Sequence, residues 1–154
     1  MYQRDYILRL IERFARALIL LRDRILNREA DQPLLAAEIG EIAKQAGLDL
    51  DVARRLDPAT LLIWLSPSGE ADQPRFWLMA ELLHLEGLRA RADEPEGGRS
   101  DFERALAILL RLPAGWRPSE DFCTAGERVA ELRGLLGPRA ENPEGIAGAP
   151  GEPS

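Results

Sequence analysis

Apolar residues recur at intervals of three and four along the first 26 positions of the chain. The six large ones that share a single helical stripe are Ile7, Ile11, Phe14, Leu18, Leu21 and Ile25. This spacing predicts a helix from about Gln3 to Leu26. A second apolar group lies beside the stripe, so the apolar arc covers roughly half of the helix circumference. We therefore expect this helix to pack on two of its sides.

Aspartate followed closely by proline marks the start of three further helices. The three pairs are Asp31 with Pro33, Asp57 with Pro58, and Asp72 with Pro74. Aspartate at an N-cap accepts a hydrogen bond from a free amide of the first turn, and proline fits that turn because it has no amide to satisfy. These signals predict helices over 33–46, 59–65 and 75–92, the first of them closed by Gly47.

Two more helices are expected in the C-terminal half. Ser100 is the predicted N-cap of a helix from Asp101 to Leu112, and a last helix is expected over about 119–136, closed by Gly137. The segment 92–99 between helices is rich in Gly, Glu and Pro, which predicts a mobile loop.

No window of four or more residues alternates apolar and polar positions with enrichment in β-branched residues, so we expect no sheet. The predicted fold class is all-α, either an array of helical hairpins or an irregular helical bundle. Residues 138–154 contain Gly, Pro, Glu and Ala with one large aliphatic residue, Ile146, which cannot offset the entropy of ordering the backbone. We expect a single all-helical domain over 1–137 and a disordered tail over 138–154.

The segment from Phe76 to Leu112 resembles one tetratricopeptide repeat. The residues that match the large–large–small–large pattern of the first helix of such a repeat are Phe76, Met79, Ala80 and Leu83. Phe102, Ala105 and Leu109 are similar to the aromatic–alanine–large pattern of the second helix, and Gly87 stands near the end of the first. The resemblance covers one unit of about 37 residues and implies a helical hairpin of the kind that stacks into arrays.

The opening Arg4-Asp5-Tyr6-Ile7-Leu8-Arg9-Leu10-Ile11 resembles the start of an uncharacterised bacterial family of unknown function. That family begins with a similar helix of Asp, Tyr and aliphatic residues before helical repeats. The resemblance implies a helical start and no particular activity.

Length and composition exclude several classes of protein. The chain has 154 residues, 45% of them hydrophobic and 30% charged, as in a one-domain globular protein. Its net charge of −6 argues against nucleic acid as a partner, because phosphates attract basic surfaces. Cys123 is the only cysteine, so no intrachain disulfide can form and we expect a cytoplasmic protein. Apolar runs such as Ala17 to Leu21 are too short to span a bilayer, and we expect no signal peptide.

Charge is distributed unevenly along the chain. Residues 1–28 hold seven Arg and three acidic residues, a net +4, and the remainder carries −10. The apolar arc of the first helix is either buried against other helices or a second copy of itself, or it lies on an anionic membrane surface. The acidic residues Asp5, Glu12 and Asp23 weaken attraction to lipid, so burial is favoured and peripheral membrane attachment is the alternative.

The side chains that catalysis or metal binding needs are few. His84 is the only histidine, so it has neither a second histidine nor a cysteine cluster to complete a transition-metal site, and a structural histidine is favoured over a catalytic one. Glu81 precedes His84 by three positions, so on this interpretation the two side chains form an ordinary pair on the helix surface. Cys123 is expected to be an idle thiol, since Glu120 and Asp121 oppose ionisation. We expect no enzymatic activity, no cofactor and no metal.

The pattern is typical of a non-enzymatic protein–protein interaction module or a self-associating scaffold. Its partner would be a protein or peptide received in a groove between helix pairs, or a second copy of the chain. Tyr2, Tyr6 and Arg9 are the candidate contacts of a homodimer, and Trp77 and Trp116 are candidates beside a groove, although packing is the favoured interpretation of both tryptophans. The alternative from another class is an accessory subunit of an enzyme whose site a partner completes.

Overall fold

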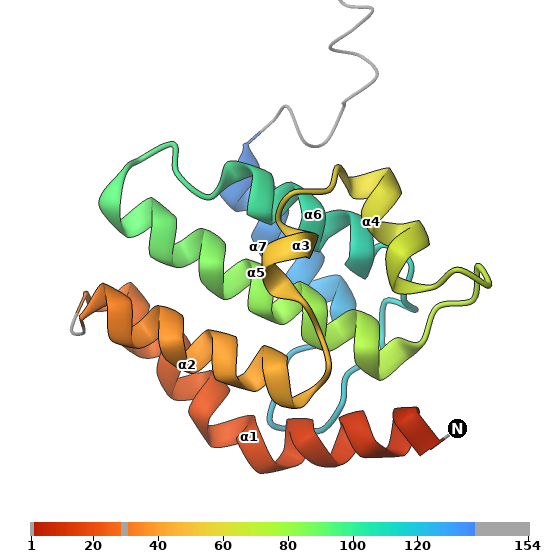
Figure 1. Ribbon diagram of the computed structural model, residues 1–154. Helices are drawn as coiled ribbons and strands as arrows, with labels where there is room; N and C mark the ends of the chain where they lie inside the picture. Colours follow the sequence, from red (N-terminus) through yellow and green to blue (C-terminus); the bar gives the residue numbers. More distant parts are fainter. Residues whose placement is uncertain (1, 29–30, 138–154) are drawn as a thin grey trace, which may run out of the picture.

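The computed structural model describes residues 2–28 and 31–137, and that part of the chain contains seven helices and no strand (Figure 1). The all-α prediction is confirmed. The helices are α1 (Tyr2–Leu26), α2 (Gln32–Gln45), α3 (Leu50–Ala53), α4 (Pro58–Leu65), α5 (Gln73–Asp93), α6 (Arg99–Leu109) and α7 (Ala125–Leu136). The predicted tail over 138–154 lies outside the described residues.

The three helix starts that aspartate and proline predict are confirmed. The Asp31 side chain accepts from the amide of Leu34 at 3.4 Å, and that of Asp57 accepts from the amide of Thr60 at 3.0 Å. Asp72 caps α5 in the same way. Each cap satisfies one of the amides that the first turn leaves without an intrahelical partner.

The predicted start of the last helix near Ser119 is wrong. α7 begins at Ala125, because Thr124 and Glu127 form a capping box in which each side chain accepts from the other's backbone amide, at 3.2 and 2.9 Å. Ser119 instead shapes a turn by accepting from the amide of Asp121 at 3.2 Å. Cys123 therefore precedes the helix.

The predicted loop over 92–99 is too long, and the predicted N-cap at Ser100 is wrong. α5 continues to Asp93, and α6 begins at Arg99 after a compact turn whose N-cap, Gly98, has a φ of 80°. That turn fits against α5, since an added Cβ at Gly98 would overlap the carbonyl of Gly87. A Cβ at Gly87 would lie 2.5 Å from the ring of Phe102, so these two glycines permit the close approach of α5 and α6.

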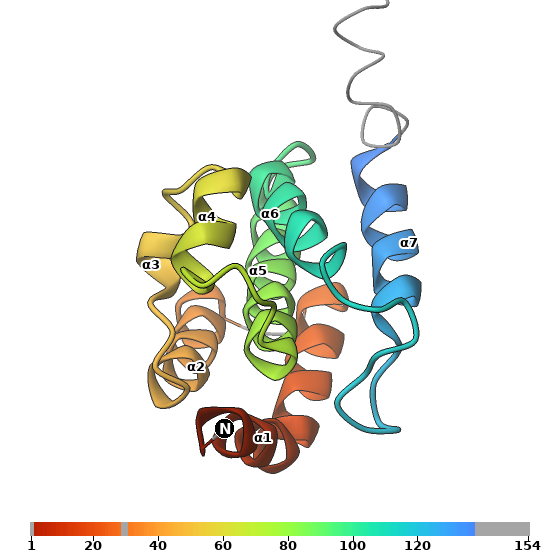
Figure 2. The ribbon, with the colours of Figure 1, turned by 90° about the vertical axis from the view of Figure 1, so that its right-hand side faces the viewer.

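α5 is the central helix of the fold (Figure 2). Every residue from Phe76 to Leu88 is buried, because α1 and α2 pack on it from one side and α6 from another. α7 and α4 pack in turn on α6. The residues that carry the tetratricopeptide resemblance are buried on α5 and α6, and the family itself stays a prediction.

The apolar stripe predicted for α1 faces α5 and α2. Five of its six members are buried and Phe14 is partly buried. Of the apolar residues beside the stripe, Ala15 is buried, whereas Ile19 and Leu26 are 39% and 50% exposed. We expected α1 to be covered on two sides. Within the described residues, the second of these sides is partly exposed.

Candidate binding groove

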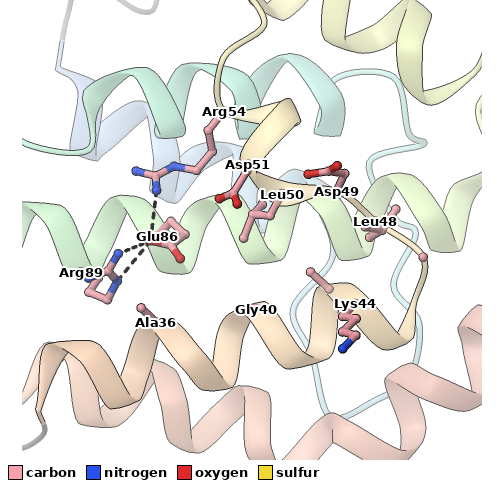
Figure 3. Close-up of a pocket in the computed structure, with 12 residues that line it drawn as sticks. Ala36, Gly40, Lys44, Leu48, Asp49, Leu50, Asp51, Arg54, Glu86 and Arg89 are labelled. Carbon is pink, nitrogen blue, oxygen red and sulfur yellow. Dashed lines mark hydrogen bonds and ion pairs between the residues drawn. The ribbon is translucent and has the colours of Figure 1, made fainter.

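A groove of about 530 Å³ runs between α2, α3 and α5 (Figure 3). Its floor on α2 is made by Ala36, Gly40 and Ala43, so no long side chain covers the helix backbone there. A Cβ added at Gly40 would meet nothing within 4 Å. This stretch of α2 is therefore open to close approach by another molecule.

The end of α2 fixes the shape of the groove. Gly47 has a φ of 72°, and the amide of Leu48 donates to the carbonyl of Ala43 at 2.9 Å, as in a Schellman motif. The chain then turns directly into α3, whose N-cap Asp49 accepts from the amide of Val52 at 3.1 Å. The turn and α3 form the second wall of the groove, with Asp51 and Lys44 at its edge (Figure 3).

Glu86 of α5 also lines the groove, and its side chain is 6% exposed. Its Oε1 accepts from Nε and Nη2 of Arg89 at 3.1 and 2.6 Å, and Nη1 of Arg54 lies 3.5 Å from the same oxygen. Nη1 of Arg89 also donates to Gln32 at 3.3 Å. The two guanidinium groups that flank this buried carboxylate offset the cost of removing it from water.

The same guanidinium of Arg54 holds α3 against α6. Nε and Nη2 of Arg54 donate to the two oxygens of Asp101, each at 3.0 Å, and Asp101 is itself buried. That hydrogen bond to Asp101 raises the pKa of Arg54 further above its ordinary value. Arg104 lies 3.8 Å from Asp101 and donates to the carbonyl of Leu56 at 2.6 Å. Lys44, Asp49 and Asp51 also line the groove, so the cations and the carboxylates around it are equal in number.

A second charged cluster connects α1, α5 and α7. Nε and Nη2 of Arg128 donate to the two oxygens of Glu81 at 3.2 and 2.9 Å, and Nη1 donates to Glu131 at 2.6 Å. Arg22 of α1 donates to the other oxygen of Glu131. A cavity of about 360 Å³ beside this cluster is lined by both arginines and by Cys123.

Electrostatics within this cluster follow from burial. Burial raises the pKa of Glu81 against the attraction of Arg128. Burial would lower the pKa of Arg128, but Glu81 and Glu131 reverse that and hold it above the ordinary value. The pair is thus a buried ion pair whose two members depend on each other. The helix-surface pairing expected between Glu81 and His84 does not form, because Glu81 binds Arg128 instead.

His84 lies in the core behind Glu131. Its side chain is fully buried, neither ring nitrogen has a hydrogen-bond partner among the described residues, and Nε2 is 3.6 Å from Oε2 of Glu131. Burial, reinforced by Arg128, lowers the pKa of His84 to about 3. The histidine is therefore neutral near pH 7.

The Cys123 thiol is half-buried beside this cluster. Burial raises the pKa of this thiol, although Arg128 opposes the shift. A thiol in this setting is a poor nucleophile near pH 7, because the thiolate is the reactive form.

The residues that the sequence suggested as contacts lie in several places. The Tyr6 hydroxyl donates to the carbonyl of Gln45 at 3.1 Å and Arg9 is exposed, both on α1, whereas the Tyr2 side chain lies outside the described part of the chain. Trp77 is 1% exposed and packs edge-on against Phe122 with ring centroids 4.8 Å apart. This corrects the idea that Trp77 borders a groove. Trp116 is half-buried and packs on the core.

The groove residues themselves were missed by the sequence reasoning. Gly40 stands 46 positions before Glu86, and the sequence carries no local signal that α2 and α5 lie side by side. A glycine in the middle of a predicted helix was the one available hint, since such a glycine often has a packing or functional reason.

Within residues 2–28 and 31–137, no three His, Cys, Asp or Glu side chains are placed to hold a metal ion. None of the described helices is both long and apolar enough to cross a membrane. No protein-family model, curated protein or solved structure matches this chain.

Proposed function

We propose that this protein is a non-enzymatic interaction module that receives a segment of a partner protein in the groove between α2, α3 and α5. The groove itself carries the proposal, because its volume of about 530 Å³ is combined with a floor of small residues. Small side chains let a partner's backbone approach closely, which raises shape complementarity. The buried charges below it are already paired, so binding does not require new burial of an isolated ion.

Filling the groove is expected to abolish partner binding without harming the fold. Gly40→Leu places an aliphatic side chain into open space above α2, and it also replaces a mid-helix glycine, which adds about 0.5–1 kcal/mol of stability. A partner captured by a photoreactive residue at Lys44, on the edge of the groove, supplies the ligand for calorimetry. We expect Gly40→Leu to weaken its binding by at least about tenfold, or roughly 1.4 kcal/mol.

Gly134→Leu is the matched control. Gly134 is an exposed glycine within α7, and an added Cβ there also meets nothing within 4 Å, but it does not line the groove. Its variant should gain similar stability and bind the partner as the wild type does. Equal affinity of the two variants would show that the partner binds elsewhere.

Self-association through α1 is the second candidate function, and the exposed apolar residues of that helix favour it. Ile19 and Leu26 lie seven positions apart on one face of α1, and both are at least 39% exposed. If this face joins two copies, Ile19→Ser/Leu26→Ser will convert a dimer to a 17.1 kDa monomer in light scattering coupled to size-exclusion chromatography. Ile63→Ser, on an exposed part of α4, is the control and should leave the mass unchanged. A wild-type chain that is monomeric at every concentration contradicts this candidate.

A further inference from the structure

The outward face of α1 carries two large apolar side chains between a cation and an anion. Ile19 and Leu20 are 39% and 42% exposed. Arg16 lies three positions before Ile19, Asp23 lies three positions after Leu20, and both are exposed. Residues seven positions apart share one face of a helix, so Arg16 and Asp23 flank the apolar pair on that face. Figure 1 shows α1 along the lower edge of the molecule. The face is therefore open to another molecule.

Arg16 and Asp23 are available for pairing across such a contact. The neighbouring Arg22 is already bound to Glu131. By contrast, neither Arg16 nor Asp23 forms an ion pair with another residue of the part of the chain that the structure describes. Opposite charges on a second surface can pair with these two side chains and fix the orientation of that surface.

The two ends of the face differ in charge. Asp23 borders the cavity beside Cys123, and five carboxylates and two arginines line that cavity, so this end is acidic. The other end is basic on balance, with three exposed arginines and two exposed acids. These residues are Asp5, Arg9, Glu12, Arg13 and Arg16. A face that is basic at one end and acidic at the other complements a second copy of itself that runs in the opposite direction.

A two-fold axis brings the opposite charges together. In a symmetric contact, residue i of one copy meets residue j of the other, and j meets i. An axis that passes between Ile19 and Leu20 covers both apolar side chains, and antiparallel helices then place positions at equal distance from the axis opposite each other. Arg16 lies opposite the other copy's Asp23, and Asp23 lies opposite its Arg16. We propose that two copies of the chain associate through this antiparallel contact of their α1 helices, with two reciprocal Arg16–Asp23 ion pairs.

This inference rests on self-association through α1, the second candidate function, and adds its geometry. Charge selects the orientation, since the apolar centre alone would permit parallel helices as well. In a parallel contact Arg16 would face Arg16 and Asp23 would face Asp23, and like charges oppose association. In the antiparallel contact no two like charges face each other. Its other facing pairs are Arg13 with Leu26 and Glu12 with Asn27.

Charge reversal tests the inference on the full chain. The variants Arg16→Glu and Asp23→Arg each change one exposed position of α1 to a good helix former, so both should fold. In either variant both pairs join like charges, so we expect the dimer dissociation constant, measured by analytical ultracentrifugation, to rise at least about tenfold. In Arg16→Glu/Asp23→Arg the pairs re-form with reversed signs, and the dissociation constant should return to within about threefold of the wild type.

Mixing the two single variants gives an independent test of the symmetry. Glu at position 16 of one chain then faces Asp-to-Arg at position 23 of the other, and the unchanged Asp23 faces the unchanged Arg16. An equimolar mixture should therefore form a heterodimer from chains that associate poorly alone. Arg55→Glu is the matched control, because it makes the same change in net charge at an exposed residue whose side chain donates to the carbonyl of Asp51. It should leave the dissociation constant unchanged, and circular dichroism checks that every variant is folded.

Three outcomes overturn the inference. The first is equal dissociation constants for the wild type and both single variants, and the second is a double variant that associates as weakly as the single ones. If Ile19→Ser/Leu26→Ser still dissociates the dimer in either case, self-association through α1 stands and only its antiparallel geometry fails. The third is a wild-type chain that is monomeric at every concentration, which removes self-association as well and leaves this face to a different partner.

Discussion

Replacing Arg128 with methionine is expected to lower the free energy of unfolding by about 3–5 kcal/mol. Glu81 is 4% exposed, and both of its carboxylate oxygens accept from Arg128. Methionine keeps much of the buried volume of arginine but removes the cation that donates to both oxygens of Glu81. Urea denaturation followed by circular dichroism at pH 7 measures the loss.

Two further variants show whether the loss comes from an unpaired buried charge. In Arg128→Met/Glu81→Leu neither charge remains, so the stability should return to within about 2 kcal/mol of the wild type. Arg24→Met removes a half-exposed ion pair, with Glu38 at 3.2 Å, and should change stability by less than about 1 kcal/mol. An Arg128 variant no less stable than the Arg24 variant would contradict the assignment.

The protein is expected to lose stability as the pH falls from 7 to 5, with His84 contributing about 1.4 kcal/mol for each unit below pH 6.5. Burial lowers the pKa of His84 to about 3 in the folded state, whereas the unfolded chain restores a value near 6.5. Between these two values the unfolded state binds one more proton than the folded state, so stability rises with pH. His84 is the only histidine of the chain. Urea denaturation at closely spaced pH values measures the slope.

His84→Gln isolates this contribution from its charged neighbours. The charged groups that act on His84 are Arg128, Glu131 and Arg22, and Glu81 is paired with Arg128. Burial raises the pKa of Glu81, while Arg128 and Arg22 lower that of Glu131 although burial opposes them, so the two carboxylates contribute with opposite signs. The Glu81 contribution is common to wild type and variant, whereas that of Glu131 includes its interaction with His84. The difference between the two slopes therefore reports His84, and parallel curves would show that His84 does not titrate as expected.

Local chemistry was sufficient to predict most of the helices. Asp31, Asp57 and Asp72 cap helices through hydrogen bonds that span three residues, so a short stretch of sequence contains both partners. The stripe on α1 was predictable for the same reason, since the helical repeat alone places its members on one face. These features depend on neighbours in the sequence and need no knowledge of the fold.

Helix boundaries that depend on packing were less predictable. The compact turn before α6 exists because Gly98 lies against Gly87 of α5. The local sequence shows only a polar stretch rich in glycine, which does not reveal this contact. α5 was predicted as the first helix of a helical hairpin, yet its polar residues Glu81, His84 and Glu86 are buried too. They are buried because other elements cover every side of α5, which no periodicity within the helix reveals.

The sequence by itself determined that the chain is helical, where most helices start, and which face of α1 is buried. Only the tertiary structure decided what the polar residues of α5 do. Arg128 pairs with Glu81 across 47 positions, as Arg54 does with Asp101, and Arg54 also reaches Glu86 from α3. The groove likewise requires α2 and α3 to lie beside α5. Such pairings arise from the packing of helices whose order in space the local pattern does not encode, so the candidate site became visible only when the helices were assembled.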